Sequence, residues 1–249
     1  MFTPEQLAQF SRDGYTIERA LAPRELCARL LTRAQEDLAQ ARLPLEYEAD
    51  VGYPGAPASH TASGGRTVRR LLQAYDRDEL FQAWARHPKS LARLRQLLGS
   101  DIVLPLAHHN CIMTKQPRHS SDTLWHQDIR YWSYARPELV SVWLALGDET
   151  VANGALRLVP GTHRIDFDSA RFDTARFFRT DLAENQTLLR TEKVAELQAG
   201  DVLFFHARTL HAAGRNTTDA TKFSLVFTYR PKDNLPLAGR SAATREIAF

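Results

Sequence analysis

The chain has 249 residues, of which 43% are hydrophobic and 24% charged, the balance of an ordinary globular protein with a sizeable core. The formal net charge is +3 without a long basic run, which argues against nucleic-acid binding but suits an anionic small molecule. No apolar run reaches the roughly 18 residues of a membrane span, and the N-terminus lacks the features of a signal peptide. We therefore expect a cytoplasmic protein, with Cys27 and Cys111 as free thiols.

The first hundred residues are expected to be mostly helical. Thr3 offers an N-cap, Pro4 the first helical position and Gln6 the partner of a capping box, so a helix should run to about Arg12 and stop at Gly14. The expected elements that follow are a strand at 15–17, helices from Pro23, at 78–84 and at 90–98, and a Pro- and Gly-rich loop at 41–65 that suits a lid.

The character of the sequence then changes to short strands separated by Gly, Pro, Asn and Asp. In 223–229, apolar residues alternate with smaller ones, as in a sheet with two different faces. Helices first and strands later argue against a doubly wound α/β fold. We expect one domain over 1–249, with a mostly helical flank at 1–100 and an antiparallel sandwich or barrel at 101–231. The expected strands are 102–104, 107–113, 139–146, 155–159, 202–205 and 223–229.

His126 and Asp128 are the strongest candidates for a functional site. Two residues apart on an extended segment, their side chains point to the same side. A second, distant histidine would complete the 2-His-1-carboxylate facial triad of non-heme Fe(II) oxygenases. His206 and His211 are the candidates for that third ligand, and the small residues after His211 favour it because they let a ligand approach closely.

Three segments in this order resemble the phytanoyl-CoA dioxygenase-like family of Fe(II)/2-oxoglutarate-dependent oxygenases. They are 125–128 (WHQD), 153–163 (NGALRLVPGTH) and 200–216 (GDVLFFHARTLHAAGRN), and the resemblance extends to about Pro231. It implies a mainly β fold with flanking helices, built on a double-stranded β-helix, or jelly roll. It also implies Fe(II) held by His126, Asp128 and His211, with 2-oxoglutarate and O₂ as co-substrates.

The resemblance further implies a cation for the far carboxylate of 2-oxoglutarate. Lys222 lies eleven residues after His211, where the family more often has Arg, and Ser224 would share its face of the strand. A Lys offers a point charge rather than a bidentate fork. Arg215 is the rival anchor. Two further residues are candidates for contacts in the same region: Lys115, near the mouth of the site, and Asn110, on the preceding expected strand, which could hydrogen-bond the co-substrate or the substrate.

By the chemistry of the family, we expect hydroxylation of an unactivated C–H bond, in a carboxylate, an amino-acid derivative or an acyl-CoA. Asp128 argues against halogenation, because halogenases of this superfamily lack the carboxylate, whereas desaturation and ring closure stay open. Two alternatives remain: a cupin-like isomerase or hydrolase without 2-oxoglutarate, and a non-catalytic protein that binds iron or a metabolite. The oligomeric state is open.

Overall fold

Two antiparallel sheets form the core of the computed structural model, which describes residues 1–237 and 245–249. The larger sheet has the order β1 (Tyr15–Glu18), β10 (Val202–His206), β7 (Val140–Ala145), β12 (Lys222–Pro231), β5 (Asn110–Lys115), β3 (Val68–Leu72) and β2 (Leu45–Tyr47). Off this order, β4 (Ile102–Pro105) pairs with the last residues of β12 and with β13 (Glu246–Ala248). The smaller sheet has the order β6 (Thr123–His126), β11 (His211–Ala213), β8 (Leu156–Leu158) and β9 (Lys193–Val194). The expected jelly roll is confirmed.

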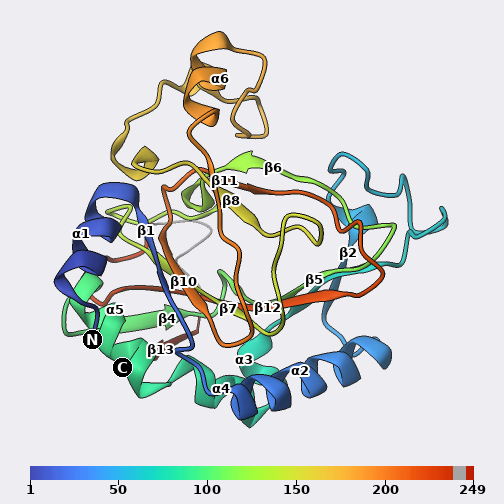
Figure 1. The fold of residues 1–249 in the computed structure, drawn as a ribbon, viewed down its shortest axis with the longest axis horizontal. Helices are drawn as coiled ribbons and strands as arrows, with labels where there is room; N and C mark the ends of the chain where they lie inside the picture. Colours follow the sequence, from blue (N-terminus) through green and yellow to red (C-terminus); the bar gives the residue numbers. More distant parts are fainter. Residues whose placement is uncertain (238–244) are drawn as a thin grey trace.

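Helices cover the outer face of the larger sheet. Figure 1 shows α2, α3 and α4 side by side beneath the strands, while the segment that carries α6 projects from the opposite side. The bounds are α1 (Pro4–Asp13), α2 (Arg24–Ala39), α3 (Ala74–Arg77), α4 (Glu79–Ala85), α5 (Pro88–Leu98) and α6 (Ala183–Leu189). None of the helices in the described ranges is long and apolar enough to cross a membrane.

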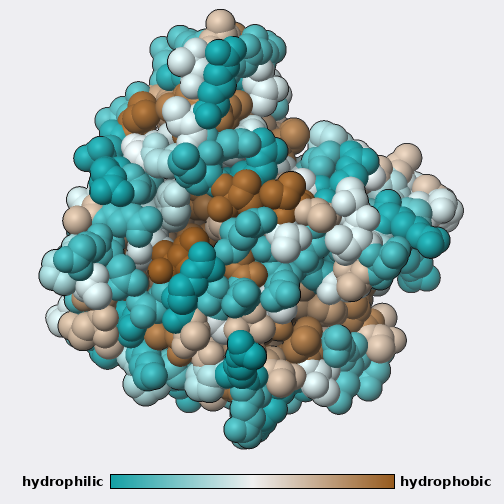
Figure 2. All heavy atoms as spheres, viewed as in Figure 1, coloured by the Kyte–Doolittle hydropathy of each residue, from teal (hydrophilic) through white to brown (hydrophobic). Residues whose placement is uncertain are grey.

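Alternation along the strands supplies two apolar layers. On β10, Phe204 packs toward the helices and Phe205 toward the other sheet, and on β12 Phe227 and Val226 divide in the same way. Each layer buries its own cluster of side chains, so the larger sheet is apolar on both faces. Figure 2 shows a mostly hydrophilic exterior, with apolar side chains gathered at the centre of this face, below the projecting segment.

Most of the expected elements are present, and the differences described next are short strands within the first hundred residues. Thr3 and Gln6 form the expected capping box, and Gly14 ends α1 with a φ of 81°. The expected loop at 41–65 contains β2 and a short 3₁₀ helix (Glu48–Asp50). The sequence did not predict β2, because an edge strand of three residues is too short to show alternation. The larger sheet also takes in β1, β2 and β3 from the first hundred residues.

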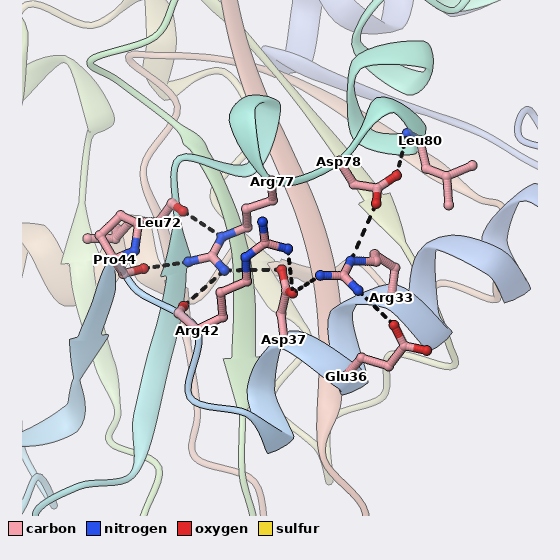
Figure 3. A network of polar contacts seen from close by, with 9 residues as sticks. All are labelled: Arg33, Glu36, Asp37, Arg42, Pro44, Leu72, Arg77, Asp78 and Leu80. Atoms are coloured by element: carbon pink, nitrogen blue, oxygen red, sulfur yellow. Dashed lines mark hydrogen bonds and ion pairs between the residues drawn. The ribbon is translucent and has the colours of Figure 1, made fainter.

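A buried ionic network fixes the hairpin of β2 and β3 to α2 (Figure 3). Asp37, near the end of α2, is 0% exposed and forms ion pairs with Arg33, Arg42 and Arg77. Arg77 also donates to the carbonyl oxygens of Pro44 (2.5 Å) and Leu72 (2.7 Å), which lie at the adjoining ends of β2 and β3. The network therefore fixes the position of β3, and β3 carries Arg69 and Arg70 into the interior of the barrel.

We predict that Asp37→Ala lowers the free energy of unfolding by about 3–5 kcal/mol, because it leaves the buried Arg77 guanidinium without its counter-charge. The neighbouring Glu36→Ala is the matched control, since Glu36 makes a solvent-exposed ion pair with Arg33 and should cost at most about 1 kcal/mol. Urea unfolding followed by circular dichroism measures both. Equal losses in the two variants would show that the network does not carry this stability.

Candidate active site

His126, Asp128 and His211 lie together, and strand pairing is the reason. His126 is the last residue of β6, and His211, the first residue of β11, is its direct partner in the antiparallel register. Asp128 follows at the start of a short 3₁₀ helix (Asp128–Tyr131). The Nε2 atoms of His126 and His211 lie 3.6 and 3.5 Å from Asp128 Oδ1. One ligand atom from each residue lies within 4.8 Å of the others, the spacing of a mononuclear metal site.

Backbone carbonyls fix the direction in which each imidazole points. The Nδ1–H of His126 donates to the oxygen of Leu124 (2.7 Å), and that of His211 to the oxygen of Thr209 (3.0 Å). Because a carbonyl can only accept, the proton of the neutral ring is on Nδ1, and both Nε2 lone pairs face Asp128. This is the tautomer that a metal ion requires.

Asp128 is a buried carboxylate without a hydrogen-bond donor. It is 0% exposed, and neither of its oxygens has a hydrogen-bond partner among the residues that the structure describes. Such a group is costly unless a further partner compensates it. A divalent cation between Asp128 and the two Nε2 atoms would be that partner, so the residues present fit a metal ion.

The charges in the cluster are close to those of a metal-binding state. Burial lowers the pKa of His126 to about 4, and the charge of His211 adds to this effect. Burial opposes ionisation of Asp128, but His109 and His211 outweigh it and hold the pKa of the carboxyl well below its usual range. Burial likewise opposes protonation of His211, but the Asp128 charge raises the pKa of this ring. At neutral pH, His126 is therefore neutral and Asp128 is ionised.

The other candidate histidine lies outside this cluster. His206 ends β10, and its Nδ1 accepts a hydrogen bond from the amide of Arg208 (3.0 Å). Its nearest ring neighbour is His163, at 5.5 Å between centroids. The structure thus brings His211, and not His206, to His126 and Asp128.

His109 is a third imidazole at the cluster, which the sequence did not reveal. Its Nδ1 lies 3.5 Å from Asp128 Oδ2, on the side away from the two candidate ligands, and burial lowers its pKa to about 4. The expected strand at 107–113 is wrong at its start, because β5 begins at Asn110 and the preceding residues form a turn. The turn directs both His108 and His109 to one cavity, whereas a strand would have separated them.

A cavity of about 690 Å³ opens beside His126. The expected loop at 41–65 contributes Tyr53 to its wall, and the projecting segment contributes Phe177. Tyr131 is the last residue of the 3₁₀ helix that begins at Asp128, and Trp132 follows it; both side chains line the cavity. The cavity therefore adjoins one face of the cluster, and the aromatic rings form one part of its wall beside charged, polar and aliphatic side chains.

Arg130 is a cation of this wall that forms no ion pair with the described part of the chain. Its guanidinium lies over the ring of Phe177, with Cζ 3.7 Å from the centroid, and over Tyr131, at 4.3 Å. Nε and Nη1 have no hydrogen-bond partner among the described residues, and Nη2 donates to the Tyr131 hydroxyl. The charge of Arg130 is close enough to depress the pKa of His126.

The two residues expected to anchor 2-oxoglutarate, Lys222 and Ser224, already bind a buried glutamate of the chain itself, Glu149. Lys222 Nζ lies 3.0 Å from Glu149 Oε2, and Ser224 Oγ donates to Glu149 Oε1 at 2.6 Å. Trp143 Nε1 donates to the same oxygen at 3.0 Å. Glu149 follows β7 in a polar turn, and it is nevertheless 0% exposed. Lys222 and Ser224 lie more than seventy residues away from Glu149 in the chain, so local sequence gave no signal of these contacts.

The remaining candidates fall in different places. Lys115 lines a narrow cavity beside the cluster together with Lys222, and its Nζ donates to the oxygen of Ser121 (2.8 Å). Asn110 lines the larger cavity, but its amide is used within the fold: it accepts from the amide of Tyr75 (2.8 Å) and donates to the oxygen of Leu106 (3.2 Å). Arg215 lines neither cavity. It lies near the surface and pairs with Asp122 at 2.6 Å.

The chain is similar to known proteins along most of its length. Residues 10–224 match the model of the phytanoyl-CoA dioxygenase (PhyH) family. The chain is 25% identical over 248 residues to an ectoine dioxygenase of Nocardia farcinica, covering 92% of this chain and 78% of that protein. It superimposes on EctD from S. alaskensis with 2-oxoglutarate and 5-hydroxyectoine with a TM-score of 0.79, at 20% identity over 95% of this chain and 78% of that one. For the epimerase SnoN in complex with Fe³⁺, alpha ketoglutarate and nogalamycin RO, the TM-score is 0.72, at 23% identity over 96% and 92% of the two chains. Because the family match spans most of its length, the chain belongs to the phytanoyl-CoA dioxygenase family.

Proposed function

We propose that residues 1–249 form one oxygenase domain that hydroxylates a C–H bond of a small molecule, with His126, Asp128 and His211 as the iron ligands. By its family, the protein is an Fe(II)/2-oxoglutarate-dependent oxygenase. The observation that carries the ligand assignment is the Asp128 carboxylate, which is buried, has no hydrogen-bond donor within residues 1–237 and 245–249 and faces two Nε2 lone pairs. A facial triad of this composition is typical of non-heme Fe(II) oxygenases.

Each residue of the chain has a definite task in this proposal. The carbonyl oxygens of Leu124 and Thr209 hold the Nδ1 protons, so that both rings present Nε2 without reorganisation. When bound, Fe(II) and 2-oxoglutarate supply the activation of O₂. The aromatic rings in the wall of the larger cavity exclude water and hold the substrate C–H bond close to His126.

Arg130 supports an anionic substrate. Its guanidinium is held between aromatic rings in the wall of the cavity, and the described part of the chain offers it no carboxylate within 4.0 Å. Glu46 lines the same cavity but pairs with Arg70 at 3.1 Å. A carboxylate on the substrate would supply the missing counter-charge of Arg130 and fix one end of the molecule while the other reaches His126.

For the metal ligands, we predict that His126→Ala, Asp128→Ala or His211→Ala weakens Fe(II) binding by more than the roughly 100-fold that changes around a metal site usually cost. His206→Ala is the matched control, because it removes a half-buried imidazole of the same barrel that lies outside the cluster. Anaerobic equilibrium dialysis against Fe(II) measures the affinity. The ligand assignment is wrong if the control loses iron and the three other variants retain it.

For the substrate, we predict that carboxylic acids stimulate succinate release from 2-oxoglutarate more than their amides do. Arg130→Met should lower kcat/KM for the best acid at least about thirtyfold, since loss of one partner of a desolvated charge pair costs about 2 kcal/mol or more. Arg179→Met, which removes an exposed arginine paired with Asp181, should leave kcat/KM unchanged. Equal stimulation by acids and amides would contradict an anionic substrate.

A further inference from the structure

Glu149 takes the place that the sequence suggested for the far carboxylate of 2-oxoglutarate. Its two oxygens accept from Lys222, Ser224 and Trp143, the first two of which are the expected anchor. The backbone of Glu149 is fixed as well, because it exchanges two hydrogen bonds with Leu197, at 2.8 and 3.0 Å. The side chain is thus part of the interior framework rather than a mobile surface group.

The positive charge of Lys222 is therefore already compensated. The exposed fractions of the Lys222 and Glu149 side chains are 3% and 0%, so the pair is shielded from water on both sides. Separating the two would leave a single charge in the interior, which is strongly unfavourable. An incoming carboxylate at Lys222 would also lie next to the Glu149 carboxylate and be repelled by it.

The other cations of the narrow cavity differ in their pairing. Arg70 lies 3.1 Å from a Glu46 oxygen, and Arg69 lies 3.4 Å from Glu46 and 3.8 Å from Glu48. Lys115 is 9% exposed and has no carboxylate within 4.0 Å in the described part of the chain. Among the described residues, it is the cation of this cavity that lacks a counter-charge.

Lys115 is also placed to replace Lys222. It ends β5 directly opposite Lys222 of β12 in the antiparallel register, and both side chains line the narrow cavity with His126, Asp128 and His211. The two lysines are therefore alternative positive charges for an anion that enters this one cavity beside the triad.

We propose that Lys115, rather than Lys222, binds the far carboxylate of 2-oxoglutarate, and that Glu149 holds Lys222 as an internal ion pair. This inference rests on the proposed function, since it concerns the co-substrate of the same site. It makes Glu149 the residue that determines which lysine carries the free charge.

The electrostatic surroundings of Lys115 agree with a role in binding an anion. Burial, with the charges of Lys222 and Arg69, lowers the pKa of Lys115 to about 7, while Glu48 and Asp122 oppose the shift. The ammonium form is thus only partly populated at neutral pH in the free protein, and a neighbouring carboxylate would stabilise it. Affinity for 2-oxoglutarate should therefore be highest below about pH 7 and fall as the pH rises above that value, because binding then requires uptake of a proton.

The test compares 2-oxoglutarate with 2-oxopentanoate, which has the same chain length and lacks the far carboxylate. Anaerobic protein loaded with Fe(II) is titrated with each oxo acid, and the ratio of the two dissociation constants isolates the contribution of the far carboxylate. Wild type should prefer 2-oxoglutarate at least about thirtyfold, and Lys115→Met should lose this preference, since a buried charge pair of this kind is worth that factor or more. The wild-type preference should also shrink between pH 6.5 and pH 8.5, and that of Lys115→Met should not depend on pH.

The control is the double variant Glu149→Gln with Lys222→Met, which removes both charges of the internal pair and leaves an acceptor for Ser224 and Trp143. It should keep the wild-type preference to within a few-fold. Survival of the preference in Lys115→Met, its loss in the double variant, or no preference in wild type would each overturn the assignment of Lys115. Failure of the wild type to bind Fe(II) or either oxo acid would instead overturn the proposed function, and this inference with it.

Discussion

The ionised and buried carboxylate of Asp128, which has no hydrogen-bond donor among the residues that the structure describes, is the constraint around which the site is built. A lone charge in the interior is unfavourable, and the fold compensates it with imidazoles on two sides rather than with a lysine or an arginine. That choice matters because imidazoles can share the carboxylate with a metal ion, whereas an ammonium or guanidinium group would exclude one. The pairing of β6 with β11 makes the arrangement possible, since it sets His211 directly opposite His126.

The cations around this centre are of two kinds: some are paired with a glutamate, and others have no counter-charge in the described part of the chain. The second kind indicates which ligands the cavities suit. Arg69, Arg70 and Lys222 each face a glutamate and hold strands together. Lys115 and Arg130 have no such partner in the described part of the chain, and each lines a different cavity beside the triad. The unpaired cations thus suit two anions, a co-substrate on one side and a substrate on the other.

Much of the fold and part of the site could be predicted from the sequence. Capping residues and alternation are local signals, so α1 and the long strand β12 were predictable within a few residues. His126 and Asp128 were recognisable because their spacing places both on one side of the chain. The choice of His211 over His206 depended on a family resemblance, because the partner of a strand is set by tertiary pairing. Glu149, His109 and Arg130 take their importance from contacts with residues distant in the chain, which spacing does not encode.

The central claim is that His126, Asp128 and His211 hold one Fe(II) ion, and anomalous diffraction tests it most directly. Crystals grown without oxygen and soaked in Fe(II) should give one strong anomalous peak at the iron edge, between the two Nε2 atoms and the Asp128 carboxylate. The peak should be absent from crystals of Asp128→Ala treated in the same way. A peak at another group of side chains, such as His163 and His206, or no peak in the wild-type protein, would contradict the account.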